Sequence, residues 1–262
     1  MLFFGNRFRL CEMFGIPIYI DITFALLLLM FMWGAPIAYG LAGVMVLAVS
    51  VILHEFGHSL TARAFGYQTN DITISLIGGC ASLIALPRKA WQELLTAIAG
   101  PAVSFALSGL ALVALLFSRI ENAWLEYVVV DIFILNLMLG VFNLLPGFPM
   151  DGGRIFRSLL RSFLSRRQAT YVAMLVGRVT AILLVLGPAL LEQIFGITHV
   201  WIIPLGGNIF IRILIAWMIW TEGYREYQLA LMESSWDYQD FRARVSPPPY
   251  GGEGDDCDVT RN

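Results

Sequence analysis

The chain has 262 residues, of which 58% are hydrophobic and only 14% are charged, whereas soluble domains usually carry about 25% charged residues. This balance excludes an ordinary cytosolic globular protein, and the formal net charge of −2 offers no basic surface for nucleic acid. The three cysteines are too few and too scattered for a disulfide framework or a thiolate metal cluster.

Long apolar stretches dominate the sequence. A helix needs about 20 mainly apolar residues to cross a bilayer, and six stretches meet this requirement: residues 16–33, 37–62, 94–117, 124–145, 171–191 and 200–220. The first stretch has no small-residue cleavage site, so we expect a retained helix and not a signal peptide. The expected fold class is an all-α polytopic membrane protein with six transmembrane helices.

Basic residues indicate the orientation of these helices, because cytoplasmic loops are enriched in Lys and Arg. They precede the first stretch, follow the last, and lie between the second and third and between the fourth and fifth, whereas the other loops contain only Arg119. Both termini are therefore predicted to be cytoplasmic. The arginines between the fourth and fifth stretches are interpreted as an ordinary topogenic signal: Arg154, Arg157, Arg161, Arg166 and Arg167.

Two regions differ from a plain helix bundle. Residues 67–86 contain β-branched residues, apolar-polar alternation and a Gly78-Gly79 pair, which predict two short strands, or a strand and a re-entrant loop, at the cytoplasmic membrane surface. Residues 246–262 have the composition of a disordered tail, and residues 222–245 are expected to form a cytoplasmic helix. The transmembrane domain then covers residues 1–221, with a catalytic core at about 37–160.

The second apolar stretch contains three ionisable residues in the run HEFGH: His54, Glu55 and His58. Ionisable groups in hydrocarbon cost at least about 2.5 kcal/mol each, so they require a function or partners. Residues four apart share a helix face, which lets both imidazoles bind one ion while Glu55 acts on water. Zinc suits this pattern, although two histidines that bond to neighbouring helices are the alternative interpretation.

A third ligand is expected from a distant segment, and Asp151 in NLLPGFPMDGGR is the candidate. Prolines end the preceding helix and glycines allow tight turns, so irregular backbone is expected to present this carboxylate beside the histidines. A simple turn without function is the alternative. Asp151 and His54 both lie toward the cytoplasmic ends of their stretches, which places them at similar depth.

Four motifs in this order resemble the site-2 protease family of intramembrane zinc metalloproteases, peptidase family M50: HEFGH, GGCASL, AIAGPAVSF and NLLPGFPMDGGR. The resemblance covers residues 15–160, and the rest of the chain is compatible with the six-helix members of the family. We expect this chain to lack both the CBS modules of some bacterial members and the PDZ domain that other members insert. It implies that His54, His58 and Asp151 bind one Zn²⁺ per chain and that Glu55 activates the attacking water.

The resemblance also assigns residues to the substrate. Asn143 matches the asparagine of an NxxP motif suited to gripping the substrate backbone, and Asn136 is expected to assist. Ser104 stands where the family commonly has asparagine, a departure that leaves a smaller polar group but touches no metal ligand. Separately, the alternation at residues 72–83 suggests that a substrate pairs with this strand around Gly79 and is held extended.

The expected function is therefore that of a zinc metalloendopeptidase that cleaves membrane-anchored proteins in a bacterial cell membrane, in regulated intramembrane proteolysis. The expected partners are the bilayer and the substrate, with no nucleic acid and with a homo-oligomer left open. A cation transporter or a non-proteolytic metal-binding scaffold is the alternative. Two further intramembrane charges, Arg178 and Arg212, are expected to pair with Asp131 or to snorkel.

Overall fold

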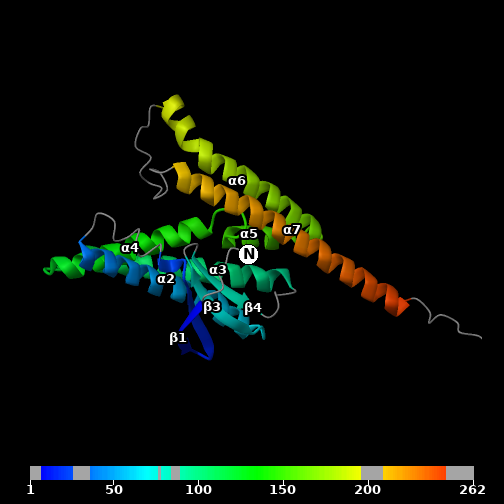
Figure 1. Ribbon diagram of the computed structural model, residues 1–262, viewed down its shortest axis with the longest axis horizontal. Coiled ribbons are helices and arrows are strands. Elements are labelled where there is room, and N and C mark those ends of the chain that lie inside the picture. The colour runs from blue at the N-terminus through cyan, green and yellow to red at the C-terminus, as the bar shows by residue number, and fades with distance from the viewer. Residues whose placement is uncertain (1–6, 26–35, 76–77, 84–88, 196–208, 246–262) are drawn as a thin grey trace, which may run out of the picture.

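Helices dominate the fold, and a small sheet packs beside them (Figure 1). The computed structural model describes residues 7–25, 36–75, 78–83, 89–195 and 209–245. The strands are β1 (Arg7–Met13), β2 (Ile16–Asp21), β3 (Thr69–Ser75) and β4 (Gly78–Leu83). The helices are α2 (Ile37–Ala64), α3 (Ala90–Phe117), α4 (Ala123–Asn143), α5 (Asp151–Leu160), α6 (Arg166–Phe195) and α7 (Ile209–Val245).

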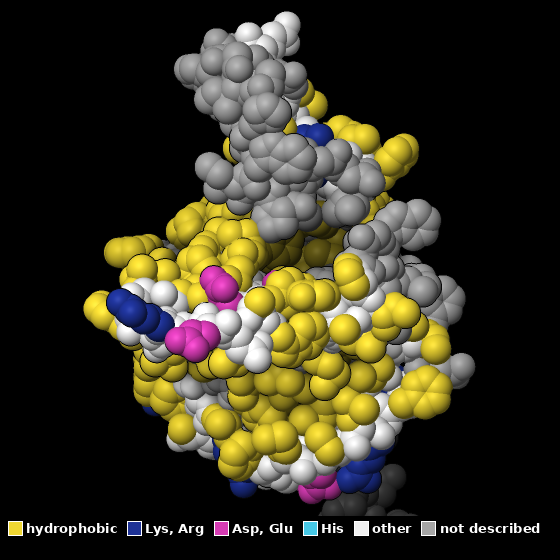
Figure 2. Space-filling model, turned by 90° about the vertical axis from the view of Figure 1, so that its left-hand side faces the viewer, with side chains coloured by type: hydrophobic (Ala, Val, Ile, Leu, Met, Phe, Trp, Pro, Cys, Tyr) yellow, Lys and Arg dark blue, Asp and Glu magenta, His cyan; other side chains and the backbone are white. Residues whose placement is uncertain are grey.

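Within the described residues, four helices are long and apolar enough to cross a bilayer: α2, α3, α4 and the Arg166–Ala189 part of α6. They match the second to fifth predicted stretches. Figure 2 shows a face of the molecule that is covered mainly by hydrophobic side chains. Such a large exposed apolar surface is unfavourable in water and matches the hydrocarbon of a membrane, as expected for an integral membrane protein.

The first predicted helix is wrong at its beginning. Residues Ile16–Asp21 form strand β2, which pairs with β1 in an antiparallel hairpin. The hairpin turns at Phe14 and Gly15, which both have positive φ. Helical structure begins only at Phe24, and residues 26–33 of the predicted helix lie outside the described residues. A continuous apolar run does not distinguish a buried strand from a helix, which explains the error.

The other two strands confirm the predicted pair in residues 67–86. β3 and β4 are antiparallel, and β3 also pairs in parallel with β2, so the strand order is β1-β2-β3-β4. Residues 72–74 therefore have a strand on each side and are unavailable for pairing with a substrate strand. β4 is an edge strand of the described sheet, and Gly79 lies in it opposite Ile74.

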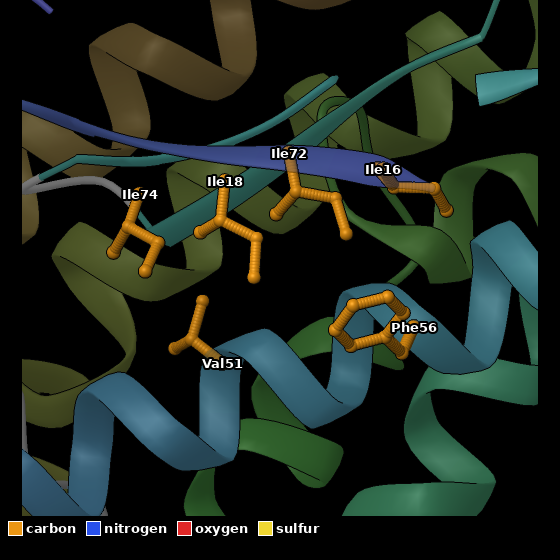
Figure 3. Packing of buried hydrophobic residues seen from close by; sticks show 6 residues of the cluster. All are labelled: Ile16, Ile18, Val51, Phe56, Ile72 and Ile74. Atoms are coloured by element: carbon orange, nitrogen blue, oxygen red, sulfur yellow. The ribbon is translucent and has the colours of Figure 1, made fainter. Parts of the chain in front are cut away.

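The inner face of the sheet packs on α2, as Figure 3 shows. Alternate residues of the two central strands point toward Val51 and Phe56 of the helix, and the resulting buried cluster is completed by Ile16, Ile18, Ile72 and Ile74. The hairpin turn adds a second attachment, since the Phe14 carbonyl accepts a hydrogen bond from Arg63 at 2.7 Å. The sheet thus fixes the part of α2 that contains His54 and Glu55.

Two further helix boundaries differ from the prediction. Asp151 is not on irregular backbone: it is the first residue of α5, a helix of 10 residues in what was expected to be a loop. The sixth predicted stretch and the predicted cytoplasmic helix belong to one helix, α7, from Ile209 onward. Residues 200–208 and the predicted tail lie outside the described residues.

Candidate metal centre

The structure brings His54, His58 and Asp151 together in the interior. The Nε2 atoms of both histidines lie 3.1 Å from Oδ2 of Asp151 and 3.2 Å from each other. All three side chains are buried, although His54 and Asp151 are 97 residues apart in sequence. Three potential metal ligands therefore meet at one point, as the sequence predicted.

Helix α3 orients both imidazoles through contacts with Nδ1, the ring nitrogen that does not face Asp151. Nδ1 of His58 lies 2.7 Å from the carbonyl oxygen of Thr96, and Nδ1 of His54 lies 2.9 Å from the hydroxyl of Ser104. A carbonyl oxygen only accepts hydrogen bonds, so Nδ1 of His58 carries a proton, and Nε2 offers a lone pair to a metal ion when the ring is neutral. This arrangement is typical of metal-binding histidines, whose second nitrogen bonds to the protein.

Gly100 lies between these two contacts on α3 and makes room for the histidines. A Cβ at this position would lie 2.2 Å from Nε2 of His58 and 2.7 Å from Nε2 of His54. No side chain fits at such distances, so glycine is required for α3 to pack directly against the rings. The AIAGPAVSF motif thus supplies the wall of the site.

Asp151 reaches the histidines because α4 ends just before it. The chain leaves α4 after Asn143, turns, and begins α5 at Asp151. A Cβ on Gly152 would lie 2.3 Å from the carbonyl oxygens of Leu144 and Leu145. The glycine after the carboxylate therefore lets the start of α5 pack tightly against the end of α4, which points to a steric reason for the DGG sequence.

The distances and charges fit a metal ion. Four ligands about 2.0 Å from a tetrahedral zinc ion are about 3.3 Å from one another, close to the 3.1 and 3.2 Å that separate these three donor atoms. One carboxylate oxygen and one ring nitrogen from each neutral imidazole can together hold a single cation.

Other predicted site residues lie on the helices α2 and α4. Glu55 is buried on α2 between the two histidines. Asn136 is fully buried and donates its amide to the Ser50 hydroxyl at 2.9 Å, which ties α4 to α2 one turn before His54. Asn143 donates its amide to the Leu139 carbonyl at 3.0 Å in its own helix.

Ser104 corrects one statement made from the sequence. It does touch a predicted ligand, since its hydroxyl is hydrogen-bonded to His54. Thr96, Gly100, Ser104 and Ser108 recur every four residues in the apolar helix α3, and all are buried. This stripe of small and polar residues was a usable signal for a helix that faces a polar site.

The two intramembrane arginines do not pair with Asp131 in the part of the chain that is described. The Arg178 guanidinium lies 4.6 Å from the centre of the Trp220 ring. Arg212 donates to the Val185 carbonyl at 3.5 Å, while Asp131 is hydrogen-bonded to Tyr127. Both arginines therefore belong to the α6–α7 pair and not to the metal centre.

Comparison with known proteins places this site in a family. The model of peptidase family M50 matches residues 42–124 and 118–187, which include both histidines and Asp151. The solved structure of a site-2 protease from Methanocaldococcus jannaschii matches with a TM-score of 0.60 and 32% identity, covering 85% of this chain and 95% of that one.

Two relatives match over a shorter range. Zinc metalloprotease MJ0392 of Methanocaldococcus jannaschii is 39% identical over 184 residues, which cover 68% of this chain and 52% of that protein. The protein sll0528 of Synechocystis sp. is 36% identical over 174 residues, which cover 60% of this chain and 45% of that one. The matched part of this chain therefore spans about half the length of these relatives.

Proposed function

The chain belongs to peptidase family M50, and from this membership we propose that it is an intramembrane zinc metalloprotease that hydrolyses peptide bonds in or near transmembrane segments of membrane-anchored proteins. The observation that carries the proposal is the convergence of His54, His58 and Asp151 at 3.1 to 3.2 Å in the interior of apolar helices. These three residues would hold one Zn²⁺. The relative MJ0392, which is named a zinc metalloprotease, supports this choice of metal.

Each protein group then has a defined task in peptide hydrolysis. Bound by His54, His58 and Asp151, Zn²⁺ would supply a Lewis acid and would lower the pKa of a water molecule to about 7. The carboxylate of Glu55 takes the proton from the attacking water and returns it to the nitrogen of the leaving amine. Ser104 and the Thr96 carbonyl keep the two imidazoles in orientation while this happens.

The substrate must be unwound before it is cut, because a helix hides its amides in its own hydrogen bonds. β4 is an edge strand of the described sheet, and a substrate segment that pairs with it around Gly79 would be held extended. Asn143, at the end of α4 and eight residues before Asp151, and Asn136 are proposed to assist in holding the substrate backbone.

The proposed topology has six crossings with both termini in the cytoplasm of a bacterial cell. Four of these crossings correspond to the apolar helices described above, and the other two include residues 26–33 and residues 200–220. The distribution of Lys and Arg supports this orientation. The metal centre then lies in the cytoplasmic half of the membrane, because only nine residues separate His54 from Arg63.

A Glu55→Gln variant tests the proposal. Purified wild type and variant are compared for zinc content and for cleavage of a membrane-anchored model substrate in proteoliposomes. We expect one zinc per chain in both proteins and a loss of cleavage of at least about a hundredfold in the variant, the usual contribution of a general base. A wild-type protein without zinc, or a variant that cleaves normally, would overturn the proposal, and zinc-dependent cation uptake would favour a transporter.

A further inference from the structure

A cluster of buried charges joins α3, α5 and α7 outside the metal centre. Arg157 on α5 is 1% exposed. Its Nε donates to Glu93 on α3 at 2.8 Å, and a terminal nitrogen donates to Glu226 on α7 at 2.8 Å. Arg161 donates to the other oxygen of Glu93 at 2.6 Å. These two arginines are therefore structural groups, and a topogenic signal is an incomplete interpretation of them.

Arg157 also contacts the segment that leads to the metal centre. Its guanidinium carbon lies 4.9 Å from the centre of the Phe148 ring, and this ring is 1% exposed. Phe148 precedes Asp151 by three residues, and Arg157 follows Asp151 by six. One side chain thus braces the chain on both sides of the metal-binding carboxylate.

The spacing along α3 and α5 shows how this contact reaches the metal centre. Glu93 precedes Gly100, which lies against the imidazoles, by seven residues, or about 10 Å of helix. Asp151 precedes Arg157 by six residues, or about 9 Å of helix. The two helices are therefore connected at two points with nearly equal separation: directly where Arg157 meets Glu93, and through the imidazoles of α2 at Gly100 and Asp151. Fixing Arg157 at Glu93 then fixes Asp151 opposite the histidines.

Buried ion pairs hold α5 in this position along α3. Burial raises the pKa of Glu226, but Arg157 and Arg154 outweigh burial and keep this pKa below its usual value. The cluster therefore pairs ionised groups. A buried guanidinium without its partner is costly, so a shift of α5 that separates Arg157 from Glu93 is strongly disfavoured. Arginine also bonds through a rigid planar fork, which defines direction as well as distance.

We propose that Arg157 is a positioning residue, which places Asp151 at the metal centre by pinning α5 to Glu93 on α3 and by bracing Phe148. This inference rests on the proposed function, because it requires that the three donors bind zinc. Arg157 thus has a role in metal binding, although its side chain does not contact the three donor atoms.

The experiment measures metal binding by the purified full-length chain. Zinc affinity is determined by competition with a chromogenic chelator, and the visible spectrum of the Co²⁺-loaded protein reports the coordination geometry. The variants are Arg157→Met, Arg157→Lys and Glu93→Gln. Arg225→Met is the matched control, since Arg225 forms an exposed pair with Glu222 inside α7.

We expect Arg157→Met to weaken zinc binding about tenfold to a hundredfold, the usual effect of removing a group that supports a metal ligand, and to change the Co²⁺ spectrum. Arg157→Lys should recover part of the affinity, because it retains the charge but not the fork. Glu93→Gln should weaken binding in the same direction, and Arg225→Met should match wild type.

The outcomes separate this inference from the proposed function. A wild-type chain that binds no zinc overturns both. A wild type that binds zinc, with Arg157→Met folded and equal to it in affinity and spectrum, overturns the positioning role alone. Where Arg157→Met fails to fold, Glu93→Gln decides in the same way, since its side chain keeps the shape and loses only the charge.

Discussion

Two buried polar clusters lie toward opposite ends of the short helix α5, and they differ in how their charges are satisfied. Toward the far end of α5, Glu93 and Glu226 are matched by Arg157 and Arg161. At the first residue, three donor atoms converge within 3.2 Å of one another. The first cluster balances its own charges, whereas the second offers one carboxylate and two imidazoles to a cation. Burial alone therefore does not identify a functional site, but unbalanced donors at one point do.

Of the changes considered, replacement of Asp151 should have the largest effect, because it removes a donor atom of the metal centre and so lowers zinc affinity. Asp151→Asn removes the only anionic ligand of the three, so zinc affinity should fall by more than about a thousandfold. Asp131→Asn is the control, because Asp131 is also carried by the apolar region but is hydrogen-bonded to Tyr127. Equal zinc binding by both variants in chelator competition would contradict the assignment of Asp151 as a ligand.

Changes in the cluster of Glu93, Glu226, Arg157 and Arg161 should alter the free energy of unfolding and not only the binding of metal. Glu93→Gln deprives two arginines of a charged partner, and breaking such a buried pair costs about 3 to 5 kcal/mol. Glu222→Gln, in the exposed Arg225 pair, should change the free energy of unfolding by less than about 1 kcal/mol. Denaturant unfolding in detergent without zinc measures both. Similar free energies of unfolding for the two variants would mean that the cluster is solvated.

Gly100, where α3 packs against the imidazoles, should not tolerate a side chain. Gly100→Ala places a methyl group where His58 now lies, so the rings must move and zinc affinity should fall about a hundredfold. Gly109→Ala is a matched control in the same helix, since a Cβ there meets nothing within 4 Å. That variant should bind zinc normally and gain slightly in helix stability. Normal binding by Gly100→Ala would show that α3 can move away from the rings.

The sequence was sufficient for the parts of the site that depend on local spacing. His54 and His58 are one helical turn apart, so their common face followed from the helix itself. Asp151 was found because the prolines and glycines around it predict a chain reversal. The geometry that joins Asp151 to the histidines needs a contact across 97 residues, which the similar depth of the two motifs and the family resemblance indicated without giving its geometry.

Other features were hidden for physical reasons. The hairpin β1–β2 was missed because the apolar residues of β2 continue into a longer apolar run, where periodicity is lost. α5 was missed because Gly152 and Gly153 have low helix propensity, and tertiary packing overrides that preference. The pairing of Glu93 with Arg157 spans 64 residues, and nothing in a local pattern specifies it.

The smallest predicted effect concerns the hydroxyl that orients His54. Ser104→Ala removes the hydrogen-bond partner of Nδ1 at 2.9 Å but leaves every donor to the metal in place. The ring then loses its fixed direction, so zinc affinity should fall about tenfold, which corresponds to about 1.4 kcal/mol. Ser108→Ala is the control one turn further along α3, where the hydroxyl donates to the Phe133 carbonyl and not to the site. A loss of zinc affinity in both variants would indicate a general loosening of α3, whereas a loss confined to Ser104→Ala would show that the support of a ligand is separable from the packing of its helix.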